Sequence, residues 1–242
     1  MFNPRSNSPF GGSRSNASAY QYQYLPYGMV AAQSGGLVSK VMALMACSFL
    51  VATVGAFIGV NIGIGLTGYL FIAIAGLIVL FALRMMINTQ GINLFLLFLF
   101  TFLEGMGLAP IIAVYLATGY GFILGQAFLL TAGTSLGLSV YAWTTKRSFA
   151  RLGDYLFFGL ILLLVAGIVE FFFQSPLFVM LVAVFGVAIF CGYILYYVQR
   201  AKYLADTLPN AIGLTVSLFI AVMNLFLYIL EILTIAQGGR RR

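Results

Sequence analysis

The chain has 242 residues, of which 62% are hydrophobic and only 7% are charged, and its mean hydropathy is strongly positive. A soluble domain of this size cannot cover its surface with so few charges. The formal net charge of +7 would suggest nucleic acid in a soluble protein. Here the basic residues lie at the ends of apolar runs, so membrane topology explains them better.

Seven apolar runs follow one another along the chain, and most reach the roughly 18 residues that cross a bilayer as a helix. The strands of a β-barrel would alternate apolar and polar residues, and these runs do not. The sequence therefore predicts an all-α polytopic membrane protein with seven transmembrane helices. The predicted spans are 38–60, 66–86, 91–117, 122–144, 153–173, 177–198 and 211–236.

The two ends of the chain differ from the apolar part between them. Residues 1–36 are rich in Ser, Asn, Gly, Tyr and Gln and contain no apolar core, so we expect a disordered polar tail. They lack the apolar segment of a secretory signal, so the first span itself must direct insertion. The other predicted parts are a membrane domain over 37–237 and a short basic tail over 238–242.

The basic residues predict the orientation of the chain. Loops near 61–65, 118–121 and 174–176 carry no Lys or Arg, whereas the N-terminal side collects nine of the twelve. By the positive-inside rule that side, with the N-terminus, is cytoplasmic. Because the chain is compact and has no organelle signal, we expect a bacterial plasma membrane, the inner membrane. The nine residues are Arg5, Arg14, Lys40, Arg84, Lys146, Arg147, Arg151, Arg200 and Lys202.

Three arginines at the end of the chain do not fit this pattern. Arg240, Arg241 and Arg242 follow an odd number of spans and would therefore lie outside. Either this short tail is translocated, or the last segment dips into the bilayer and returns to the cytoplasm. The length of residues 211–236 favours a full span.

Several classes of protein need residues that this chain lacks. It has no histidine, which removes Ser-His and Cys-His nucleophile pairs, HExxH zinc sites and bis-histidine haem. It has no GxxxxGK[ST] loop for phosphates, and its last span has no lysine for a retinal Schiff base. We expect no enzyme, no cofactor, no metal site and no nucleic-acid partner. A conduit for an ion or small solute remains, as does a protein that binds other membrane proteins.

Glu104 lies near the middle of the third span, in TFLEGMGLAP. An ionised carboxylate at the bilayer centre costs about 2.5–3.5 kcal/mol on insertion scales, so this side chain needs water, a cation or a proton. Small residues and Pro110 follow it; the former allow close helix approach, and proline frees a backbone carbonyl. Two interpretations stay open. Glu104 borders a polar cavity on an ion path, or it is a neutral acid that only fixes packing.

Two further acids lie near the outer ends of their spans. Glu170 closes the fifth span and Glu231 is similarly placed in the seventh, and both spans run outward from the cytoplasm. Acids graded in depth suit a cation path, although each side chain could simply reach the headgroups. Spacing does not reveal whether the two acids face each other. On the cytoplasmic side Arg84 ends the second span and could pair with an acid.

Small and polar residues inside the spans predict how the helices pack. Gln126 and Asn224 are candidates for hydrogen bonds between helices. GxxxG spacings, which allow close approach of two helices, occur at Gly55–Gly59, Gly59–Gly63, Gly121–Gly125 and Gly133–Gly137.

A set of motifs, taken in chain order, resembles the Bax inhibitor-1 family. The segment TAGTSLGLSVYAWTTKRSFARLGDYLFFGLILLL (131–164) contains a small-residue span, a Ser-x-Tyr element, a Thr-Lys-Arg loop and a Leu-Gly pair. FLEGMGLAP in the third span, ILYYVQRAKY (194–203) and VSLFIAVMNLF (216–226) are similar to further elements of the family. The resemblance covers about residues 37–236 and leaves only the tails outside.

The resemblance implies a compact bundle of seven helices in which the last helix is central. It also implies a pH-sensitive calcium leak and a role in stress response or, as in bacterial relatives, modulation of a membrane-bound AAA protease. In leaking members two aspartates, one in each of the last two spans, act with an arginine that Arg84 matches. Here Tyr197 and Ala221 occupy the aspartate positions, so a pH gate at that place is not expected.

Two functions from different classes therefore stay open. One is a leak for calcium or another cation, lined by Glu104, Glu170 and Glu231. The other is a regulatory protein that engages a membrane AAA protease or another complex through its basic loops and N-terminal tail, without conducting ions.

Overall fold

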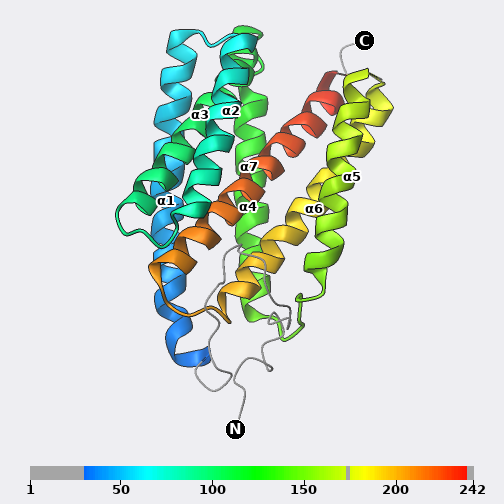
Figure 1. The fold of residues 1–242 in the computed structure, drawn as a ribbon. Coiled ribbons are helices and arrows are strands. Elements are labelled where there is room, and N and C mark those ends of the chain that lie inside the picture. Colours follow the sequence, from blue (N-terminus) through cyan, green and yellow to red (C-terminus); the bar gives the residue numbers. More distant parts are fainter. Residues whose placement is uncertain (1–29, 173–174, 239–242) are drawn as a thin grey trace. The chain divides into compact units, whose positions relative to one another are not determined.

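The computed structural model describes residues 30–172 and 175–238 of the chain. These residues form seven α-helices and no strand (Figure 1). Every one of the seven is long and apolar enough to cross a membrane, which confirms the predicted class, an all-α polytopic membrane protein. The helices are α1 (Val30–Ile62), α2 (Leu66–Met85), α3 (Ile92–Ala117), α4 (Gly121–Thr144), α5 (Leu152–Phe172), α6 (Pro176–Ala201) and α7 (Leu208–Gly238).

Helices α2 to α7 begin and end close to the predicted boundaries, whereas α1 begins earlier than expected. Residues 30–36, predicted as part of the polar tail, are helical. This part of α1 packs closely at Gly36, where a built Cβ atom would lie 2.2 Å from Oδ2 of Asp206. The rest of the predicted tails, 1–29 and 239–242, lies outside the described residues.

The length and continuity of α7 distinguish between the two alternatives for the last segment, a full span and a segment that dips into the bilayer and returns. It is one unbroken helix of 31 residues, which at about 1.5 Å per residue exceeds the thickness of the hydrocarbon core. A segment that dips and returns would need a break, and α7 has none. Its buried share, 39%, is the largest of the seven spans.

The chain divides into two compact units, and α7 contributes to both. The first unit contains α1, α2 and α3 together with residues 203–216, which include the start of α7. The second unit contains α4, α5, α6 and the part of α7 from Ser217 onward.

In the first unit α1 and α2 both pack against α3 (Figure 1). The backbones of α1 and α3 are in direct contact: a Cβ atom built at Gly105 would lie 2.0 Å from the carbonyl oxygen of Ala52. One built at Gly55 would lie 2.2 Å from the carbonyl oxygen of Phe102. Since only glycine leaves room for such contacts, the close approach predicted around Gly55 is confirmed.

The proline in α3 is also packed against α1. Pro110 has no N–H, so the carbonyl of Met106 lacks its helical donor. A Cβ atom built at Gly59 of α1 would lie 3.2 Å from that carbonyl oxygen. α1 thus fills the space beside the break in α3.

In the second unit α5 packs along α6, and glycines again bring the helices close. A Cβ atom built at Gly192 would lie 2.7 Å from a methyl group of Leu156. The GxxxG glycines of α4 behave differently. Within the described residues, Cβ atoms built at Gly125, Gly133 and Gly137 would meet no atom within 4 Å. The prediction of close packing is wrong for these three, because they lie on an open face of α4.

One of the two predicted hydrogen bonds between helices is present. The side chain of Gln126 in α4 accepts a hydrogen bond of 2.8 Å from Gln237 of α7, as predicted. Asn224 instead donates to the carbonyl of Ile220, one turn earlier in α7. Within the described residues, the hydrogen bond of the Asn224 side chain therefore stays inside α7, and the predicted bond to another helix is wrong.

Candidate functional site

The carboxyl groups of Glu170 and Glu231 lie together in the second unit. Glu170 is in the last turn of α5 and Glu231 is in the second half of α7, and their side chains are hydrogen-bonded to each other. Because an ionised carboxylate can only accept hydrogen bonds, a bond between two carboxyl groups needs a proton on one of them. The two acids that the sequence places at similar depth therefore do face each other.

Tyr228 is the third member of this site. It lies about one helical turn before Glu231, and both carboxyl groups act electrostatically on its hydroxyl group. Its ring stacks on Phe190 of α6, with 5.8 Å between the ring centroids. A Cβ atom built at Gly186 would lie only 2.5 Å from the ring, so the ring lies in space that a glycine leaves free. Three helices thus position the site.

Aromatic rings continue from this site along α6. The rings of Phe190 and Tyr193 are 6.0 Å apart, and those of Tyr193 and Tyr197 are 5.6 Å apart and stacked. Tyr197 and Ala221 stand where leaking relatives are expected to carry aspartates, and Ala221 is only 2% exposed. A phenol ring and a methyl group cannot form a pair of acids. In this chain the paired acids stand at Glu170 and Glu231.

Glu104 lies in the first unit, in a different setting. Its side chain is half-buried and reaches toward α2, where a Cβ atom built at Gly76 would lie 3.8 Å from its Oε1 atom. The surface of α2 is thus its immediate neighbour. Whether Glu104 borders an ion path or only fixes packing stays a prediction.

The predicted arginine lies at the surface of the first unit. Arg84 is exposed in the last turn of α2, where a cation complements the helix dipole. An ion pair in this unit joins Lys40 and Asp206: Nζ of Lys40 lies 3.0 Å from Oδ1 of Asp206, in the connection before α7. The sequence argument used Lys40 only as a topology signal and missed this pair.

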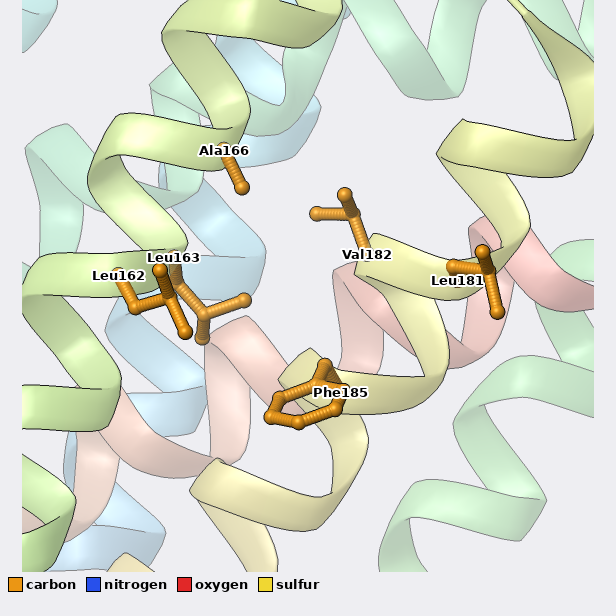
Figure 2. Close-up of a pocket in the computed structure, with 6 residues that line it drawn as sticks. All are labelled: Leu162, Leu163, Ala166, Leu181, Val182 and Phe185. Carbon is orange, nitrogen blue, oxygen red and sulfur yellow. The ribbon is translucent and has the colours of Figure 1, made fainter.

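A pocket of about 220 Å³ lies between α5 and α6 in the second unit (Figure 2). Several of its lining side chains are largely exposed, so acyl chains would cover them in a bilayer. The lining offers no polar group to an ion, which makes the acid pair the better candidate for a functional site. The lining residues are Leu162, Leu163, Ala166, Leu181, Val182 and Phe185.

The sequence argument did not find the residues around the acid pair. A signal for Tyr228 exists, because a residue one turn from Glu231 shares its helix face. No comparable signal exists for Gly186 or Phe190, because only the fold shows that the ring of Tyr228 lies over them.

Known proteins are similar to this chain over most of its length. The family described as "Inhibitor of apoptosis-promoting Bax1" matches residues 35–238. An uncharacterized protein of Campylobacter jejuni is 35% identical over 204 residues, which cover 81% of this chain and 87% of that protein. Protein lifeguard 4 of Mus musculus is 34% identical over 161 residues, 66% of either chain. The Golgi anti-apoptotic protein of vaccinia virus is 30% identical over 158 residues, 65% of either chain.

Proposed function

The chain belongs to the Bax inhibitor-1 family, and from this premise we propose that it is a leak for calcium or another cation, gated by Glu170 and Glu231, and not an enzyme. The observation that carries the proposal is the hydrogen-bonded acid pair shared by α5 and α7. Carboxylate oxygens are preferred ligands of Ca²⁺, and acids within transmembrane helices commonly mark ion paths. The basic residues support a plasma-membrane protein with a cytoplasmic N-terminus.

In this proposal, the protonation state of the pair opens and closes the leak. While the two acids share a proton, their hydrogen bond ties α5 to α7. When the last proton leaves, two negative charges repel each other and offer their oxygens to a cation. Tyr228 is a further group there that can ionise, and Gly186 and Phe190 of α6 lie against its ring. The leak is therefore expected to increase as pH rises through the titration of the pair.

Calcium flux into proteoliposomes tests the proposal. Purified protein is compared with Glu170→Gln and Glu231→Gln between about pH 5 and about pH 8. We expect flux above that of protein-free vesicles, rising with pH. Either variant should lose most of the pH dependence, because an amide keeps a hydrogen bond but does not titrate.

The opposite result points to the other candidate. If folded protein gives no flux at any pH, the leak is rejected. The regulatory function then takes its place, in which the chain modulates a membrane-bound AAA protease or another complex without conducting ions.

A further inference from the structure

The connection between α4 and α5 is held in place by a buried side chain of α6. Gln199 is only 2% exposed. Its Nε2 donates a hydrogen bond to the carbonyl of Arg147, and its Oε1 accepts one from the N–H of Phe149. A buried amide satisfied on both sides fixes the backbone that it spans. We call residues 145–151 the braced loop.

Positive charge gathers at the braced loop and at the adjoining end of α6. Asp154 is the one acidic residue within 144–154 and 199–202, which leaves a net charge of +4 from five cations and one acid. The cations of the loop are exposed, while Arg200 of α6 and Lys202 directly after it are half-buried. The five are Lys146, Arg147, Arg151, Arg200 and Lys202.

Aromatic rings place these charges at the level of lipid headgroups. Nζ of Lys202 lies 5.4 Å from the ring centroid of Trp143. Trp143, Tyr141 and Tyr155 are exposed to 38%, 45% and 74%. Exposed Trp and Tyr at the ends of transmembrane helices mark the interface between acyl chains and water. A cation that lies over such a ring faces headgroups, which favours a lipid over a water-borne protein as its partner.

The half-buried lysine adds a reason for an anion to bind there. Partial burial lowers the pKa of Lys202, because it removes water from the charged form. A bound phosphate would supply the favourable interaction that the lost water no longer provides.

We propose that the braced loop, together with Arg200 and Lys202, binds the phosphate headgroup of an anionic phospholipid in the adjacent leaflet. Guanidinium groups bind phosphate through paired hydrogen bonds, and ammonium groups add charge. Gln199 is a positioning residue, since it holds the loop in place before the lipid arrives and so reduces the ordering cost of binding.

Native mass spectrometry of the purified full-length chain tests this site. Phosphatidylglycerol and phosphatidylcholine are titrated separately, and bound lipids are counted. We expect phosphatidylglycerol to bind more tightly than phosphatidylcholine. The variant Lys146→Gln/Arg147→Gln/Arg151→Gln should weaken phosphatidylglycerol binding by roughly 10- to 100-fold, since each cation near a headgroup contributes several-fold.

Two further variants distinguish a specific binding site from a general effect of positive charge. Arg240→Gln/Arg241→Gln/Arg242→Gln removes the same charge elsewhere and should bind phosphatidylglycerol as the parent does. Gln199→Leu keeps every charge and should weaken binding several-fold. Equal losses in the two triple variants, or no preference for phosphatidylglycerol in the parent chain, would overturn the proposal. The second of these results would point to an acidic protein partner. None of these readouts depends on calcium flux, so they stand apart from the leak.

Discussion

Glu104 and the pair formed by Glu170 and Glu231 are acids in similarly apolar helices, but their surroundings differ. In the first unit Glu104 lies against the surface of α2 near Gly76. In the second unit each acid of the pair meets another acid. Two carboxyl groups that share a proton change their interaction when that proton leaves, whereas a single carboxyl group has no such partner. If the pair is the gate, what lies opposite an acid matters more for conduction than its depth in the span.

Glycine also has different packing roles in the two units. In the first unit it brings two backbones together, because the Cβ of any other residue at position 105 would overlap the carbonyl of Ala52. In the second unit Gly186 makes room for the ring of Tyr228, which stands beside the acids. A substitution should therefore affect stability in the first case and, in addition, the site in the second.

The largest expected effect is on stability, from Gly105→Ala. The new methyl group would lie 2.0 Å from a backbone oxygen that no side-chain rotation can move, so we expect a loss of about 3 kcal/mol. Thermal unfolding in detergent measures it. Gly133→Ala is the matched control, since a Cβ there meets no described atom within 4 Å, and it should be neutral or stabilising by up to about 1 kcal/mol. Equal effects of the two would refute the backbone contact.

A smaller loss of stability, with a change in the site, is expected from Gly186→Ala. The added methyl group must displace the ring of Tyr228, at a cost of about 1–2 kcal/mol. The displaced ring leaves the acids in a different environment, so the pH profile of calcium flux should shift. Gly167→Ala in α5, where a Cβ meets open space, should leave that profile unchanged. An unshifted profile in Gly186→Ala would remove Tyr228 from the site.

Glu104→Gln tests whether the single acid or the acid pair controls calcium flux. If the gate is the pair, this substitution should change calcium flux by less than about threefold, well below the tenfold that corresponds to about 1.4 kcal/mol. Flux in proteoliposomes at one fixed pH is sufficient. A loss as large as that in Glu231→Gln would place the single acid, rather than the pair, at the centre of the ion path.

The smallest effect is expected from Lys40→Met, which removes the ion pair with Asp206. The Lys40 side chain is 48% exposed, and exposed ion pairs contribute about 0.2–1 kcal/mol, less at high salt. Thermal unfolding at low and high ionic strength measures the difference. A cost that is large and independent of salt would mean that the contact of α1 with the connection before α7 matters for reasons other than charge.

The sequence predicted the spans because long apolar runs are a direct consequence of bilayer thickness. It placed Glu170 and Glu231 at similar positions in their spans, but their contact depends on the order and rotation of α5 and α7, which apolar periodicity does not specify. Gln199 was visible as part of a motif, yet its role depends on a loop folding back onto α6. The start of α1 was misplaced because a polar composition was taken to end the helix, whereas residues 30–36 are helical.

The central claim, that Glu170 and Glu231 act as one gate, is tested most directly by a double-variant cycle on pH-dependent calcium flux. Groups that act as a unit are not additive: removing one already removes the function of both. We expect Glu170→Gln, Glu231→Gln and the double variant to lose the same share of the pH dependence. Independent, additive losses would contradict the account, as would a full pH response in the double variant.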